Sequence, residues 1–161
     1  MSKEMLTCSD LRHRPTKAQD VKISIRGLQI KVFKLGNICH ACFKQEITQK
    51  IDGLEKAGYF KIARGLVTVN WPMVMRAYAL QGEWDTDYEQ VLFVLVQLGV
   101  LSYKMPGNYL IHDESGSSSF HLFGQNLYFT DQANADGYIK AYRKKYPSGS
   151  QFISAIQFAK Q

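Results

Sequence analysis

The segment TDYEQVLFVLVQLG, residues 86–99, decides the fold. It begins with the spacing of a helix capping box, from Thr86 to Glu89, and Gly99 is a usual helix end. Tyr88, Val91, Leu92, Leu95 and Leu98 form a broad apolar stripe, and with the apolar residues between them the helix is apolar nearly all round. Because a helix that is apolar all round is buried, we predict that it lies at the centre of a packed core.

Further helices and short antiparallel strands are expected on either side of this segment. Helical spacing of apolar residues predicts helices over residues 38–57, 70–81 and 131–146, whereas residues 148–160 suit a helix and a strand equally. Alternation predicts a hairpin or bent strand over residues 21–34, a strand over 59–69, and hairpins over 100–113 and 120–130. We therefore predict a single compact α+β domain over residues 21–161, with the central apolar helix packed on short antiparallel strands.

Positive charge is concentrated near the N-terminus. The formal net charge is +6, and residues 1–34 hold eight Lys and Arg against three Asp and Glu, whereas residues 71–110 hold two against four. Residues 1–20 have few apolar anchors, so we predict a flexible basic arm there. A second basic cluster lies on the predicted helix of residues 131–146.

Uneven basicity of this kind attracts phosphate-bearing partners, either nucleic acid or anionic lipid headgroups. We expect such a partner to bind the basic residues of the arm, of the strands that follow it and of the late helix. These residues are Arg12, Arg14, Lys17, Lys22, Arg26, Lys31, Lys34, Lys140, Arg143, Lys144 and Lys145.

The sequence predicts a protein of the cell interior that is not secreted. Its first residues, Met1 to Leu6, lack the basic and apolar segments of a secretory signal. The longest apolar stretch, Val91 to Leu101, is far short of the roughly 20 residues that span a bilayer. Any membrane contact is therefore expected to be peripheral, and the three cysteines are expected to be reduced thiols.

The motif Cys39-His40-Ala41-Cys42 is the one sequence pattern that is typical of redox or metal-binding chemistry. It follows a predicted strand and opens a predicted helix, the setting in which thioredoxin-like proteins lower the pKa of a reactive thiol. The same pair is half of a zinc site, which Cys8, His40 or His121 would have to complete. Since a second closely spaced pair is absent, we expect structural cysteines, without a metal, a cofactor or a catalytic role.

Between residues 59 and 101, a strand runs into Asn70-Trp71-Pro72, and Trp84-Asp85 precedes an aliphatic helix that ends in Leu98-Gly99. These motifs resemble the core of rhabdovirus matrix proteins, in which the corresponding strand leads to an Asn-Arg-Pro turn. The match covers about a quarter of the chain. Because Pro-Pro-x-Tyr and Pro-Thr-Ala-Pro motifs are absent from the sequence, members from plant viruses are the closer comparison.

This resemblance implies a non-enzymatic viral structural protein of the host cytoplasm and the inner face of the membrane. Such a protein would form homo-oligomers and bridge the viral nucleocapsid, a ribonucleoprotein, to an anionic membrane surface. Two alternatives stay open: a small basic nucleic-acid-binding regulatory protein, such as a silencing suppressor, and a thioredoxin-like thiol oxidoreductase.

Overall fold

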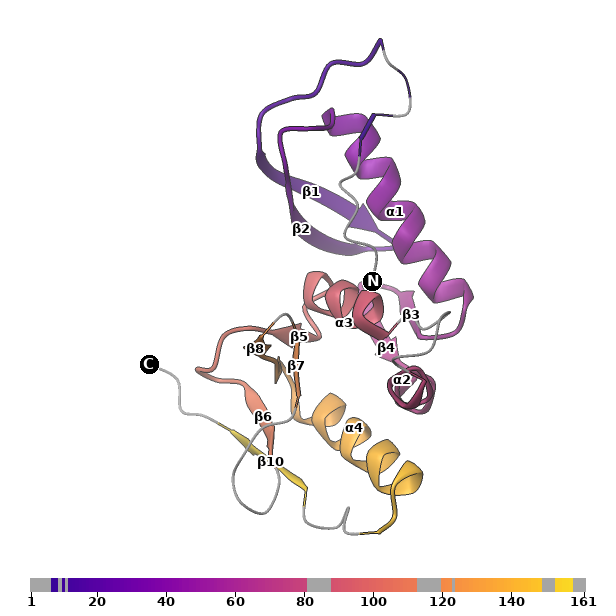
Figure 1. Ribbon diagram of the computed structural model, residues 1–161, viewed down its shortest axis with the longest axis vertical. Coiled ribbons are helices and arrows are strands. Elements are labelled where there is room, and N and C mark those ends of the chain that lie inside the picture. Colours follow the sequence, from indigo (N-terminus) through magenta and orange to yellow (C-terminus); the bar gives the residue numbers. More distant parts are fainter. Residues whose placement is uncertain are drawn as a thin grey trace. The chain divides into compact units, whose positions relative to one another are not determined.

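The computed structural model describes residues 7–8, 10, 12–80, 88–112, 120–122, 124–148 and 153–157 (Figure 1). These residues form helices and several small antiparallel sheets, which confirms the α+β class. The chain divides into two compact units, Ser2–Thr68 and Val69–Gln161.

The first unit consists of two hairpins and a long helix. Strands β1 (Gln19–Ile25) and β2 (Leu28–Lys34) pair antiparallel and are followed by helix α1 (His40–Lys56). Strands β3 (Phe60–Ala63) and β4 (Leu66–Val69) then form the second hairpin, where the sequence predicted one strand with an irregular middle. Helix α1 contacts both β1 and β3.

The core of this unit is formed by apolar side chains from the β1–β2 hairpin, from α1 and from β3. The inner face of the first hairpin buries Val21, Ile23, Ile25, Ile30 and Val32. Helix α1 buries Phe43, Ile47, Ile51 and Leu54, and β3 adds Phe60 and Ile62. The opposite face of the β1–β2 hairpin is exposed to solvent.

Both hairpins turn at an Arg-Gly pair. Arg26 and Gly27 have φ angles of 45° and 86°, and Arg64 and Gly65 have 54° and 76°. Consecutive positive φ angles define the type I′ turn, whose twist matches the flanking strands. The two turns also touch, because the Gly65 amide N–H donates to the Arg26 carbonyl at 3.0 Å. A Cβ atom at Gly27 would lie 3.0 Å from the Gly65 nitrogen, so this contact requires glycine.

The second unit packs three helices on a four-stranded sheet. Its helices are α2 (Trp71–Ala79), α3 (Tyr88–Gln97) and α4 (Gln132–Lys145). The strand order is β10-β6-β9-β5, formed by Ser154–Gln157, Tyr109–His112, Tyr128–Phe129 and Leu101–Ser102. A small separate hairpin joins β7 (His121–Leu122) to β8 (Gln125–Asn126).

The predicted hairpin over residues 100–113 was wrong. Strand β9 lies between β5 and β6 and pairs with both. Tyr128 and Phe129 of β9 are buried, so this inserted strand places two aromatic side chains at the centre of the sheet. The segment of residues 148–160, for which a helix and a strand were equally expected, contributes strand β10.

Helix α3 is buried, as the sequence predicted. Leu92 and Leu95 are fully inaccessible to solvent. The capping residues Thr86 and Asp87, like the Trp84-Asp85 pair, lie outside the described residues. Within the part of the chain that is described, no helix combines the length and the hydropathy needed to cross a bilayer.

Aromatic rings fill the interface between α2, α4 and β9. The Trp71 ring lies 5.3 Å from that of Phe129 and 5.9 Å from that of Tyr138. Its indole Nε1 donates to the Asn134 side-chain oxygen at 3.0 Å, which satisfies the buried N–H. Gly137 makes room for this ring, because a Cβ atom there would lie 2.6 Å from Trp71 Cδ1.

Two helical glycines should therefore respond in opposite ways to alanine. Gly53→Ala in α1 meets nothing within 4 Å, so helix propensity should raise the free energy of unfolding by about 0.5–1 kcal/mol. Gly137→Ala should lower it by about 1–3 kcal/mol, since the overpacking at Trp71 outweighs the same propensity gain. Urea unfolding followed by circular dichroism measures both, and equal stabilisation by the two variants would contradict the packing of Trp71 over Gly137.

Candidate anion-binding surface and cysteine cluster

Two lysines face each other on the exposed side of the β1–β2 hairpin. The antiparallel register places Lys22 directly opposite Lys31, and both side chains are exposed. Neither lysine forms an ion pair with the part of the chain that the structure describes. Like charges directly opposite each other destabilise a sheet, so this pair is unfavourable for folding and favourable for holding an anion.

An aromatic side chain lies beside the lysine pair. Phe33 is 58% exposed and, because strand residues alternate, it shares the outer face with Lys31. Phe33 pairs with Asp20, and it is therefore the diagonal neighbour of Lys22, at about 7–8 Å between α-carbons. The outer face of this hairpin thus combines two ammonium groups and the Asp20 carboxylate with an exposed aromatic ring.

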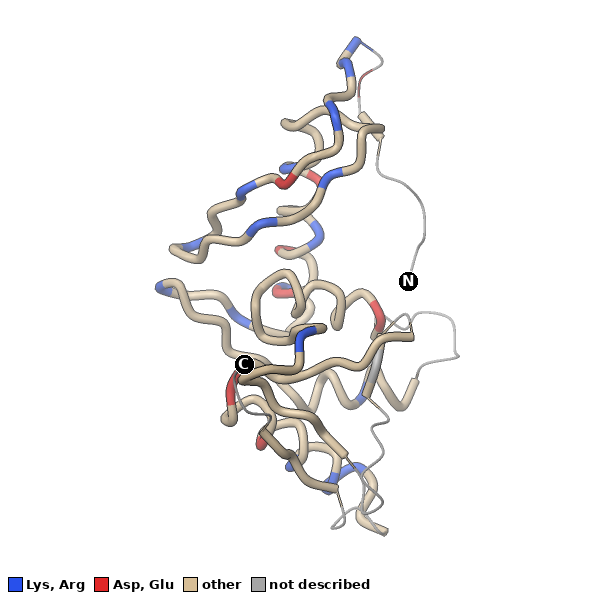
Figure 2. The backbone as a smooth tube through the Cα atoms, turned by 90° about the vertical axis from the view of Figure 1, so that its left-hand side faces the viewer, with Lys and Arg blue, Asp and Glu red and all other residues tan. Residues whose placement is uncertain are grey.

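The whole first unit is basic, and the second is not. Residues 2–68 hold thirteen Lys and Arg against six Asp and Glu, a net charge of +7. Residues 69–161 hold seven against eight, a net charge of −1. Figure 2 shows Lys and Arg along both hairpins of the first unit. The excess positive charge of the chain therefore lies in this unit.

Arg26, predicted to bind an acidic partner, is instead engaged within the protein. Its guanidinium forms ion pairs with Asp52, at 3.4 Å, and with Glu55 of helix α1. The same group donates from Nε to the Ile62 carbonyl at 3.1 Å. Since two carboxylates offset its charge, Arg26 serves to join the hairpin turn to α1 and β3.

The residues of the predicted flexible arm lie against the loop that precedes α1. The Thr16 amide N–H donates to the Ile38 carbonyl at 3.2 Å. Arg12 is exposed and pairs with Asp10 at 2.8 Å, and this guanidinium lowers the pKa of the Asp10 carboxyl. Arg14 and Lys17 are exposed, so their charges add to the field of the unit.

Lys34 does not lie on the outer surface, where we had expected it. Its side chain is completely buried. The ammonium Nζ donates to four main-chain carbonyl oxygens: Thr16 at 2.7 Å, Lys17 at 2.9 Å, Leu35 at 3.0 Å and Ile38 at 2.9 Å. These bonds compensate for the loss of water around the charge, and they exclude Lys34 from contact with a partner.

Strand periodicity gives the reason for this burial. Lys34 has the same parity as Ile30 and Val32, which face the core, while Phe33 has the parity of Lys31, which faces outward. The alternation was already visible in the sequence. The expectation failed because a lysine was taken to be exposed by residue type, although its position in the strand indicated the opposite.

The second basic cluster belongs to the other unit. Lys140, Arg143, Lys144 and Lys145 are all exposed on α4. The last three occupy the final turn, where positive charge favours the helix dipole. Arg143 donates from Nη2 to the Ile153 carbonyl at 2.6 Å. Lys140 and Arg143 also line an open groove, which the carboxylate of Asp136 shares.

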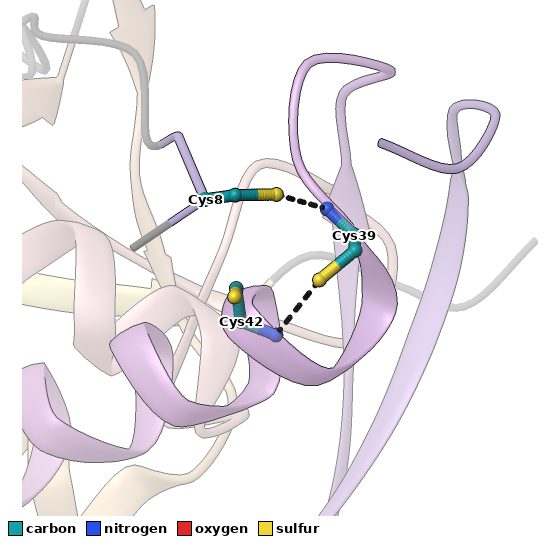
Figure 3. Close-up of side chains that lie close together, drawn as sticks. All are labelled: Cys8, Cys39 and Cys42. Atoms are coloured by element: carbon teal, nitrogen blue, oxygen red, sulfur yellow. Dashed lines mark hydrogen bonds between the residues drawn. The ribbon is translucent and has the colours of Figure 1, made fainter. Parts of the chain in front are cut away.

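Three cysteines from two segments converge at the start of α1 (Figure 3). The sulfurs of Cys8, Cys39 and Cys42 all lie within 4.8 Å of one another, and all three are free thiols. Cys39 is the N-cap of α1, and its sulfur accepts the Cys42 N–H at 3.4 Å. The sulfur of Cys8 accepts the Cys39 N–H at 3.2 Å.

A histidine that sequence reasoning missed lies beside this cluster. His13 Nδ1 is 3.2 Å from the Cys42 sulfur, and this contact raises the pKa of the imidazole. The sequence had offered His40 and His121 instead. Nδ1 of His40 lies 3.5 Å from the Gln19 side-chain amide. The side chain of His121 is not among those that the structure describes. The available signal was a Cys and a His five residues apart, upstream of the paired cysteines.

The thiols influence one another. The Cys39 N–H lowers the pKa of the Cys8 thiol, whereas burial and the neighbouring Cys39 and Cys42 sulfurs raise it, and the net shift is upward. Strand β2, which leads into α1, belongs to an antiparallel hairpin. This differs from the parallel βαβ setting in which a thioredoxin-like Cys-x-x-Cys motif is expected.

Comparison with protein-family models, with curated proteins and with solved structures finds no match for this chain.

Replacing the buried ammonium should destabilise the first unit. Lys34→Met keeps most of the side-chain volume but leaves the carbonyls of Thr16, Lys17, Leu35 and Ile38 without their shared donor. The free energy of unfolding should fall by roughly 2–5 kcal/mol. Lys31→Met, on the exposed face of the same strand, is the matched control and should change it by about 0.5 kcal/mol or less. Equal urea midpoints for the two variants would show that the buried bonds contribute nothing.

Proposed function

We propose that this protein is a non-enzymatic nucleic-acid-binding protein that holds single-stranded RNA on the outer face of the β1–β2 hairpin. The observation that carries the proposal is the directly opposed Lys22–Lys31 pair beside the exposed ring of Phe33. The same face supplies a site for phosphate and a site for a base.

The lysine pair supports phosphate binding. A phosphate between Lys22 and Lys31 would replace ammonium–ammonium repulsion by two attractions. The net charge of +7 over residues 2–68 would draw a polyanion towards this face before contact is made. The bound phosphate would thus offset the repulsion between the two ammonium groups of the free protein.

The exposed phenylalanine supports binding to a single strand. Aromatic side chains on a sheet surface stack on unpaired bases, and each such stack contributes about 1–3 kcal/mol. In a duplex the base faces are occupied by neighbouring pairs, so Phe33 would gain little there. Leu35, 49% exposed one position beyond the strand, extends the apolar part of this surface.

A matrix-type role would require more than RNA binding. Self-association, attachment to a membrane and a viral source stay predictions of the sequence resemblance. RNA binding is common to the matrix-type role and to the regulatory alternative, and it is the activity that the basic hairpin supports.

Neutralising the opposed lysines should weaken RNA binding without harming the fold. Lys22→Gln with Lys31→Gln should lower the affinity for a labelled oligouridylate of about 20 nucleotides by roughly tenfold at 0.1 M salt. The slope of log affinity against log salt should become less steep by about 1.4, at about 0.7 per lost phosphate contact on a single strand. Fluorescence anisotropy measures both quantities.

Lys44→Gln with Lys56→Gln is the matched control, since it removes the same charge from exposed positions on α1. The hairpin variant also relieves like-charge repulsion, so its free energy of unfolding should stay level or rise. If the two double variants lose affinity equally, the hairpin face is not the binding site.

Phe33→Ala should lower RNA affinity by about 5- to 150-fold, which corresponds to the loss of one stacked base. Leu66→Ala removes a side chain that is 71% exposed in the same unit, and it should leave the affinity unchanged. Vesicles with anionic lipid test the membrane alternative: loss of vesicle binding in Phe33→Ala with RNA binding intact would favour a lipid surface over RNA.

A further inference from the structure

We propose that Cys8, His13, Cys39 and Cys42 form a structural zinc site that ties residues 8–18 to the N-terminus of α1. This site is separate from the hairpin face and goes beyond the proposed RNA binding. It also departs from the expectation of metal-free cysteines, because the structure adds a third sulfur and an imidazole to the half site that the sequence showed.

The sulfur geometry suits tetrahedral zinc. Zinc–sulfur bonds of about 2.3 Å place the sulfurs of a tetrahedral site about 3.8 Å apart. The three sulfurs here already lie within 4.8 Å of one another, although they come from segments 31 residues apart. Small side-chain rotations therefore bring them to ligand positions.

His13 supplies the fourth ligand. In a tetrahedral site a histidine nitrogen and a cysteine sulfur are about 3.6 Å apart. Nδ1 of His13 lies 3.2 Å from the Cys42 sulfur, close to that separation. Three thiolates and one imidazole make a closed Cys₃His set, which is typical of structural zinc and leaves no position for a substrate.

Main-chain donors already surround the sulfurs. The Cys39 N–H points to the sulfur of Cys8, and the Cys42 N–H to that of Cys39. Such bonds offset negative charge on metal-bound thiolates and orient them. Zinc binding would release the three thiol protons to solvent, and the complete site would carry a net charge of −1.

Zinc would stabilise a segment that has little apolar surface to bury. Residues 12–18 are all exposed, and they are held through the main-chain bond of Thr16 and the Lys34 ammonium. A metal link from Cys8 and His13 to α1 closes a long loop, which lowers the conformational entropy of the unfolded chain.

The test uses the full chain, prepared reduced and metal-free, and titrated with zinc against a chromophoric chelator. We expect one zinc ion per chain and a higher unfolding midpoint for the loaded protein. Cobalt(II) in place of zinc should give the visible absorption of a tetrahedral thiolate complex. Cys8→Ser should weaken zinc binding by at least about 100-fold.

His40→Asn is the matched control, since His40 lies between the two α1 cysteines in sequence and contacts Gln19 instead. It should bind zinc like the parent, whereas His13→Asn should alter the cobalt spectrum. Three results would overturn the proposal: no zinc bound at micromolar concentration, equal affinity in Cys8→Ser, or reduction of insulin disulfides by the Cys39–Cys42 dithiol, which would itself be oxidised to a disulfide. An unchanged cobalt spectrum in His13→Asn would overturn the fourth ligand.

Discussion

The ammonium of Lys34 is the interaction on which the first unit depends. Burying a charge costs several kcal/mol unless hydrogen bonds replace the lost water, and Lys34 makes these bonds to four carbonyl oxygens. The carbonyls come from three places: the segment before β1, the end of β2 and the approach to α1. A single side chain therefore links, through hydrogen bonds, the segments that flank the cysteine cluster.

The strand register determines which side chains the hairpin exposes to solvent. Successive strand residues face opposite sides, so a slip of one position would bring Phe33 inward and Lys34 outward. The same slip would expose Ile30 and Val32 and bury Lys31, so hydrophobic burial opposes it. The carbonyls around the Lys34 ammonium add to this preference, because they offset the cost of placing one charge on the inner face. The exposed aromatic ring beside Lys22 and Lys31 thus belongs to the same register that buries Lys34.

Apolar spacing in the sequence predicted the helices, but it did not predict which strands pair with one another. Helices α1, α2, α3 and α4 follow from apolar spacing and from caps such as Asn70 and Asp131. The insertion of β9 between β5 and β6 joins segments whose periodicity carries no information about partners. The division at residue 68 leaves no Pro- or Gly-rich linker to mark it. Of the site, the basic strands were visible in the sequence, whereas the meeting of Cys8 and His13 with Cys42 depends on how the chain folds back.

The contact between the two Arg-Gly turns limits where the chain can accept insertions. Hairpin tips are normally where a protein tolerates insertions, tags and circular permutation. Here the tips at Gly27 and Gly65 face each other across a main-chain hydrogen bond, so a longer loop at either one displaces the other. Natural variation in loop length, and any label added by an experimenter, is better accommodated in the other unit, at the exposed turn of Met105 and Pro106.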